Sequence, residues 1–170
     1  RSSIDLVAGR YHLSALFAAE HGIRGDIQAG KRVETQIDPE TGVPVHSVYG
    51  ATKRLTDEML ETFDVFLYDM QCVGVRFWTF LYSLAYAMQA CAEAGKPVVV
   101  LDRLNPLSIG RLEGTILDPA FASFVGDYVL PSRHGLTVGE FARYVKAYLN
   151  LDLDLTVVPL EGYGRGLYLD

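Results

Sequence analysis

The chain has 170 residues, enough for one ordinary domain with a sizeable hydrophobic core. With 49% hydrophobic and 21% charged residues it has the composition of a globular protein, and no run approaches the roughly 20 apolar residues that span a bilayer. The net charge of -6 argues against broad nucleic-acid binding, because affinity for phosphate depends on Lys and Arg. We therefore expect one domain, residues 1–170, with no membrane span and no nucleic-acid partner.

Neither the ends of the chain nor its two cysteines match a pattern for targeting, nucleotide binding, disulfide formation or zinc binding. The chain opens without the charged segment and apolar core of a signal peptide, and it closes soon after a glycine-rich stretch at residues 162–166. This stretch departs from the dinucleotide-binding fingerprint, so we expect no nucleotide cofactor. Cys72 and Cys91 are too few and too far apart to predict a disulfide framework or a zinc site.

Short apolar runs without clear polar alternation predict the strands. They lie at residues 13–18, 65–68, 98–101 and 124–130, and a further run follows at residues 155–158. Near-continuous runs of this length are typical of strands that are covered by helices on both faces.

Segments with helical period lie between these runs. A Thr at position 56 followed by two acids predicts a short helix, and Leu81, Leu84, Met88 and their neighbours predict a longer one that ends before Gly95. The capping-box pattern at residues 137–140 predicts a third helix. The alternation of strands and helices implies right-handed crossovers, hence an α/β, Rossmann-like three-layer domain with a mainly parallel sheet.

Two long irregular segments, residues 28–48 and 102–119, are predicted as loops. The first contains the turn signal Asp38-Pro39-Glu40-Thr41-Gly42, and the second is rich in Gly and Pro. Loops of this length in a compact domain are usually functional, so we expect these two to wall a cleft.

Charged or polar side chains follow each of the first four runs. Because ligands of open α/β sheets bind beyond the carboxyl ends of the strands, we expect these side chains to converge on one crevice. The clusters are Glu20, His21 and Arg24; Asp69, Gln71 and Arg76; Asp102, Arg103 and Asn105; and Arg133 with His134.

Glu20 is the leading candidate for an acid catalyst, since it follows a strand and lies between Ala19 and a turn that contains Gly22. A partly desolvated carboxyl group in such a place can protonate a leaving oxygen, as a glycosidase requires. The alternative is a loop acid that pairs with Arg24 or Lys31.

Asp69, Asp102 and Glu113 are candidates for a second carboxylate. The two aspartates follow strands, where an Asp often caps a turn or a helix instead. Glu113 precedes Gly114 and has no obvious helix to cap, which favours a catalytic role for it.

The remaining polar candidates would bind substrate. A guanidinium group of Arg24, Arg76 or Arg103 matches a carboxylate in bidentate fashion, although local pairing with Asp69 or Asp102 is the alternative. We expect four further residues to make supporting contacts with the substrate: His21, His134, Asp102 and Asn105.

A series of separated segments carries a resemblance to one known family. They are Leu16-Phe17-Ala18-Ala19-Glu20-His21-Gly22-Ile23-Arg24-Gly25, Thr41-Gly42-Val43-Pro44-Val45, Tyr49-Gly50, Asp69-Met70-Gln71, Val73-Gly74-Val75-Arg76-Phe77, Leu101-Asp102-Arg103, Asn105-Pro106, Leu112-Glu113-Gly114, Leu117-Asp118-Pro119 and Arg133-His134-Gly135-Leu136-Thr137-Val138-Gly139-Glu140. In this order they resemble the N-terminal Rossmann-like domain of the NamZ-type exo-β-N-acetylmuramidases, which are bacterial peptidoglycan-recycling glycosidases.

The resemblance implies removal of terminal N-acetylmuramic acid from the non-reducing end of peptidoglycan fragments, with Glu20 of the Glu-His-Gly motif as the leading catalytic carboxyl group. The lactyl carboxylate of this sugar would then pair with one of the three arginines. It further implies that the chain lacks a first strand and a C-terminal domain that helps to form the cleft. The resemblance places the protein outside the cytoplasm, in an extracellular or periplasmic compartment.

Two other functions are compatible with the same residues. One is a carbohydrate-binding or scaffold domain that keeps the cleft but performs no chemistry. The other is a metal-dependent hydrolase that uses His21, Asp69, Asp102 and His134. The leading prediction remains a glycosidase without metal or cofactor.

Overall fold

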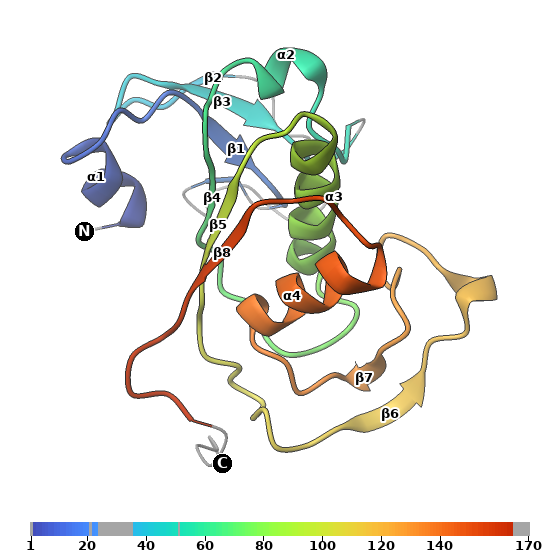
Figure 1. The fold of residues 1–170 in the computed structure, drawn as a ribbon. Coiled ribbons are helices and arrows are strands. Elements are labelled where there is room, and N and C mark those ends of the chain that lie inside the picture. The colour runs from blue at the N-terminus through green and yellow to red at the C-terminus, as the bar shows by residue number, and fades with distance from the viewer. Residues whose placement is uncertain (1, 21, 24–35, 51, 165–170) are drawn as a thin grey trace. The chain divides into compact units, whose positions relative to one another are not determined.

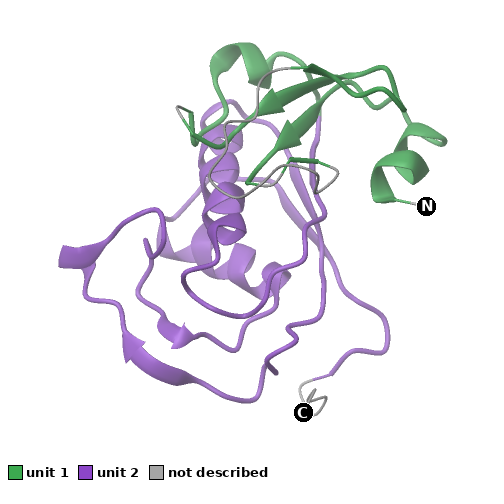
Figure 2. Cartoon of the chain, turned by 180° about the vertical axis from the view of Figure 1, so that it is seen from behind, with its two compact units in different colours: residues 1–64 green, residues 65–170 purple. Residues whose placement is uncertain are grey.

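The structure is a computed structural model, and it describes residues 2–20, 22–23, 36–50 and 52–164. The chain divides into two compact units, Arg1–Asp64 and Val65–Asp170, which Figure 2 shows in different colours.

Unit 1 contains a small three-stranded sheet of order β1-β3-β2. β1 runs parallel to β3, with Ala18 opposite Ser47, and β2 pairs with β3 in antiparallel fashion. Leu16, Ala18 and Val45 form the buried centre of this sheet. The elements are α1 (Ser3–Ala8), β1 (Leu16–Ala18), β2 (Gln36–Ile37), β3 (Pro44–Ser47) and α2 (Asp57–Leu60).

The predicted turn connects β2 and β3. The backbone N–H and the hydroxyl group of Thr41 both donate to Asp38 Oδ2, at 3.0 and 2.6 Å, and Gly42 has a φ of 74°. The prediction of one irregular loop over residues 28–48 was wrong at β2 and β3, because strand pairing supplies the backbone hydrogen bonds there. Residues 28–35 lie outside the described residues.

Unit 2 is built around the parallel sheet β4-β5-β8 with the helices α3 and α4 (Figure 1). This arrangement confirms the α/β class. The elements are β4 (Phe66–Tyr68), α3 (Thr79–Glu93), β5 (Val98–Leu101), β6 (Glu113–Ile116), the 3₁₀ helix η1 (Pro119–Phe121), β7 (Pro131–Arg133), α4 (Val138–Tyr148) and β8 (Leu155–Val158).

Local sequence signals explain where the helices begin and end. Thr56 caps α2, and Thr137 and Glu140 form the predicted capping box of α4. Gly95 has a φ of 65° directly after α3, as expected for a glycine that ends a helix. The apolar faces of α3 and α4 supply the core of unit 2, which includes Leu81, Leu84, Met88, Cys91, Phe141 and Val145 together with Val98 and Val100 of β5.

Burial alternates along the strands β4, β5 and β8 of the parallel sheet, contrary to the expectation that both faces of each strand are covered. In β4, Phe66 and Tyr68 are buried whereas Leu67 is 41% exposed, and in β8 Val158 is 44% exposed. An unbroken apolar run therefore does not establish burial of both faces.

The prediction of a strand at residues 124–130 was wrong, since strand β7 lies directly after this segment. Ser123 and Gly126 exchange backbone hydrogen bonds of 2.8 and 2.9 Å in a tight turn. Of the segment's apolar residues, Tyr128 packs in the core, with its ring 6.2 Å from that of Tyr82 and 5.8 Å from that of Phe141, whereas Val125 and Val129 are exposed. Likewise, the predicted loop 102–119 contains β6, which pairs with β7.

Across the residues that the structure describes, no helix has the length and apolar character needed to cross a membrane.

Candidate active site

Glu20 and Tyr49 meet at the carboxyl ends of two neighbouring parallel strands in unit 1. Glu20 follows β1 by two residues, and Tyr49 follows β3 by two residues. The backbone N–H of Val48 donates to the carbonyl oxygen of Ala18 at 2.9 Å, which extends the β1–β3 pairing toward both side chains. The Tyr49 hydroxyl group donates to Glu20 Oε1 at 3.0 Å. The ends of the strands thus bring a carboxyl group and a phenol together.

The local backbone holds both members of this pair. Ala19, directly before Glu20, is 3% exposed, and its carbonyl oxygen accepts from the N–H of Gly22 at 3.2 Å. On the other strand, the hydroxyl group of Ser47 donates to the carbonyl oxygen of Tyr49 at 3.0 Å. The hydrogen bond to Glu20, together with burial and the carboxylate charge, raises the pKa of Tyr49 above its usual value. The phenol is therefore held in its protonated form.

His21 and Arg24, which the sequence predicts as substrate contacts, lie outside the described residues.

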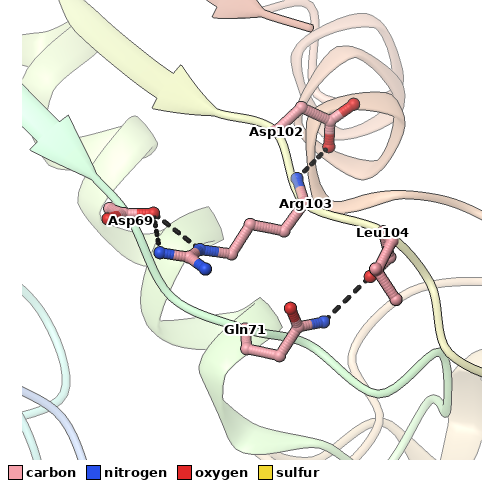
Figure 3. A network of polar contacts seen from close by, with 5 residues as sticks. All are labelled: Asp69, Gln71, Asp102, Arg103 and Leu104. Carbon is pink, nitrogen blue, oxygen red and sulfur yellow. Dashed lines mark hydrogen bonds and ion pairs between the residues drawn. The ribbon is translucent and has the colours of Figure 1, made fainter. Parts of the chain in front are cut away.

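Asp69 and Arg103 form an ion pair at the carboxyl ends of the neighbouring strands β4 and β5 of unit 2 (Figure 3). Both Nε and Nη2 of Arg103 approach Asp69 Oδ1 at 2.6 Å. This bond raises the pKa of Arg103, whose side chain is 39% exposed. Gln71 Nε2 donates to the carbonyl oxygen of Leu104 at 2.8 Å and joins the same two loops. Side chains that follow these two strands thus meet, whereas the expected convergence of all four polar clusters on one crevice stays a prediction.

Asp102 holds the start of α4. Its carboxylate accepts from the hydroxyl group of Thr137 at 2.9 Å and from the backbone N–H of Gly139 at 2.8 Å. A Cβ atom at position 139 would lie 2.8 Å from Asp102 Cγ, so glycine permits this close approach. These bonds satisfy donors at the first turn of the helix. Asp102 therefore caps a helix, which is the alternative to catalysis that the sequence left open for it.

Arg76 and Asn105 bind backbone carbonyl groups. Arg76 Nη1 donates to the carbonyl oxygens of Thr115 and Leu130 at 2.7 and 2.6 Å, so it ties β6 to the segment before β7. Asn105 is 4% exposed, and its Nδ2 donates to the carbonyl oxygen of Leu136 at 3.0 Å. In this structure both side chains connect loops, and their predicted contact with substrate stays a prediction.

His134 is buried and neutral. It is 2% exposed, and its Nδ1 accepts from the backbone N–H of Leu136 at 3.2 Å. Burial lowers the pKa of His134 to about 4. Because Nδ1 is an acceptor, the ring proton of the neutral form belongs on Nε2.

Glu113 lies in strand β6, with a side chain that is 57% exposed and accepts from Arg133 Nη1 at 2.7 Å. Gly114 is required by the packing of the β6–β7 pair, since a Cβ atom there would lie 2.6 Å from Ser132 Cβ and φ is 82°. The flanking glycine, which favoured a catalytic Glu113, thus has a structural explanation. Asp69 and Glu113 are both members of ion pairs, and their role as second carboxylate stays a prediction.

Tyr49 is the residue that the sequence reasoning missed. It belongs to the Tyr49-Gly50 motif and follows a short apolar segment as the other candidates do, but residues 28–48 were interpreted as a loop rather than a strand. Correct placement of β3 would have added Tyr49 to the residues at the carboxyl ends of strands.

The described part of the chain offers neither a metal-binding cluster nor an activated thiol. No group of three or more His, Cys, Asp or Glu side chains gathers there in a way that suits a metal ion. Cys72 is buried, and burial raises its pKa to about 12, so its thiol is not an activated nucleophile.

The fold and this geometry define an α/β protein with candidate polar sites at the ends of parallel strands. Its sequence matches a family described as exo-beta-N-acetylmuramidase NamZ, N-terminal, over residues 1–170. The chain belongs to this family, and its resemblance in the separated motifs is thereby confirmed.

The comparisons with individual proteins agree with this family. The chain is 48% identical over 172 residues to the peptidoglycan beta-N-acetylmuramidase NamZ of Bacillus subtilis (strain 168), with 100% of this chain and 42% of that protein covered. Two crystal structures of DUF1343 family proteins from Bacteroides fragilis are also similar. One has a TM-score of 0.89 at 37% identity and the other 0.83 at 33%. The matches cover 99% and 98% of this chain, and 43% and 44% of those proteins. The chain thus spans less than half the length of each.

Proposed function

We propose that the protein is a peptidoglycan glycosidase that removes terminal N-acetylmuramic acid from the non-reducing end of cell-wall fragments. The observation that carries this proposal is the position of Glu20, at the carboxyl end of β1 with its Oε1 bound by Tyr49. The identity of 48% to a peptidoglycan beta-N-acetylmuramidase supports the substrate class. An α/β domain with a carboxyl group beyond a strand end is a suitable framework for this chemistry.

Glu20 would act as the general acid. It would transfer a proton to the glycosidic oxygen while the bond between this oxygen and C1 breaks, and a water molecule would add to C1. Such a step requires a carboxyl group held in a fixed orientation, and the bond to Tyr49 supports that requirement. The proton of the water would pass to a second carboxylate.

Among the arginines, the bonding pattern favours Arg103 over Arg76 for binding a carboxylate group. Nη1 of Arg76 already donates to two carbonyl oxygens, and removal of this side chain would leave both oxygens without that donor. Arg103 uses Nε and Nη2 on one oxygen of Asp69 and remains 39% exposed. A partly exposed guanidinium that is held in place by an ion pair is suited to pair with the lactyl carboxylate of muramic acid.

The relatives are more than twice as long as this chain, which supports a C-terminal domain as a further partner in the complete enzyme. An extracellular or periplasmic location is proposed as well, because intact peptidoglycan lies outside the cytoplasm.

The test is release of a chromophore from a β-linked N-acetylmuramic acid glycoside, with the N-acetylglucosamine analogue measured beside it. It is run on this chain and on the complete gene product that carries it. Glu20→Gln should abolish release while leaving the protein folded, because the amide has no transferable proton. Glu61→Gln, an exposed residue at the end of α2, is the matched control.

The outcomes separate this function from the non-catalytic alternative. An unchanged rate in Glu20→Gln would disprove the role of Glu20. Sugar binding by calorimetry without product from either protein would instead favour a carbohydrate-binding domain.

A further inference from the structure

We propose that Tyr49 is a positioning residue for Glu20: its phenol donates to Oε1 and holds the carboxyl group in one orientation for proton transfer to substrate. This inference rests on the proposed function of Glu20. The donor–acceptor direction, with the phenol as donor and Oε1 as acceptor at 3.0 Å, is the observation behind it.

The pairing has a rigid basis. β1 and β3 are adjacent and parallel, and their pairing continues through the bond between the Val48 N–H and the Ala18 carbonyl oxygen at 2.9 Å. Ser47 then fixes the backbone at Tyr49 from both sides, since its hydroxyl group donates to the Tyr49 carbonyl oxygen at 3.0 Å and accepts from the Tyr49 N–H at 3.4 Å. The phenol is thus carried by a strand end rather than by a long loop.

This arrangement restricts the carboxyl group of Glu20. The bond from the phenol to Oε1 limits rotation of the carboxyl group, which keeps it directed toward one position.

The phenol itself is suited to this role because it stays protonated. Its pKa is raised mainly by the bond to Glu20, so it remains a donor at every pH at which a glycosidase of this kind would operate. A Ser or Thr hydroxyl group at position 49 would be too short to replace it.

The first experiment compares Tyr49→Phe with Tyr11→Phe in the chromophore assay, on the complete gene product. Tyr49→Phe removes one oxygen atom and keeps the ring, so the fold should be preserved. We expect kcat to fall about 10- to 100-fold with KM changed less than about threefold, since the loss concerns orientation of the reacting group. Tyr11 also lies in unit 1 but is 72% exposed, so its variant should retain the activity of the parent protein.

A second experiment tests the hydrogen bond without reference to activity. Tyrosine labelled with ¹³C at Cζ is incorporated, and Tyr49→Phe identifies the signal of Tyr49 by its disappearance. If Glu20 holds the phenol as proposed, Glu20→Gln should shift this signal and should lower the pH at which Tyr49 ionises. The signal of Tyr11 should stay unchanged.

The results distinguish failure of this inference from failure of the proposed function. Loss of release in Glu20→Gln with normal kcat in Tyr49→Phe would overturn the positioning role alone. An unaffected Tyr49 signal in Glu20→Gln would overturn the hydrogen-bonded pair itself. A covalent sugar adduct on Tyr49, found by mass spectrometry, would replace the positioning role with a nucleophilic one. Full release in Glu20→Gln would instead reject the proposed function.

Discussion

Acidification should destabilise the protein through His134. The ring is 2% exposed, and its Nδ1 accepts from the N–H of Leu136. Protonation would place a charge in the core and would remove this acceptor. The pKa of about 4 in the folded protein is below the ordinary value of 6.5, so the folded state binds fewer protons than the unfolded chain between these two values.

The sign and size of the effect follow from this difference in pKa. The contribution of neutral His134 is fully present above pH 6.5 and is lost progressively as the pH falls toward 4. Between pH 7 and pH 5 the free energy of unfolding should fall by about 2 kcal/mol from this group alone.

Urea denaturation at pH 7 and pH 5 measures the effect, with His134→Asn as the matched variant. Asn cannot titrate, and its side-chain oxygen can still accept from the N–H of Leu136. His134→Asn should be less stable at pH 7, because the ring leaves a cavity, but should lose about 2 kcal/mol less than the parent protein between the two pH values. An equal loss in both proteins would refute the reasoning.

Three further predictions concern side chains of unit 2. Asp102→Ala should lower the free energy of unfolding by about 3 kcal/mol in chemical denaturation, since two donors at the start of α4 lose a charged acceptor; a loss below about 0.5 kcal/mol would contradict this. Gly74→Ala should lower the free energy of unfolding by about 2 kcal/mol or more in thermal denaturation, because φ is 76° and a Cβ atom would lie 2.2 Å from Asn105 Oδ1. An unchanged midpoint of thermal unfolding would show that the site relaxes freely. Arg76→Gln should destabilise by about 2 kcal/mol through loss of its two bonds to carbonyl oxygens, whereas the exposed Arg143→Gln on α4 should change little. Equal effects of the two arginine variants would reject the structural role of Arg76.

The candidate site was partly predictable from the sequence. Glu20 was found because an acid after an apolar run and before a glycine is a local pattern, and Asp69 and Arg103 were placed together because both follow strands. Tyr49 was missed because β3 is only four residues long and adjoins a polar segment, so its periodicity is weak.

Local signals determined the helices α2, α3 and α4 and the strands β1, β4, β5 and β8. The caps at Thr56 and Thr137 and the glycine after α3 act within about four residues of the helix end, so the amino-acid order contains the whole interaction. The runs that became β4, β5 and β8 were likewise evident from their composition.

Tertiary structure alone decided what most of the polar candidates bind. Asp102 meets Thr137 across 35 positions of the sequence, and Arg76 meets the carbonyl oxygen of Leu130 across 54. The side-chain chemistry of an Asp or Arg suits a substrate and a backbone group equally well, so sequence could not choose between the two. The choice depends on which buried donors and acceptors the folded chain leaves to be satisfied, and only the packed structure specifies those.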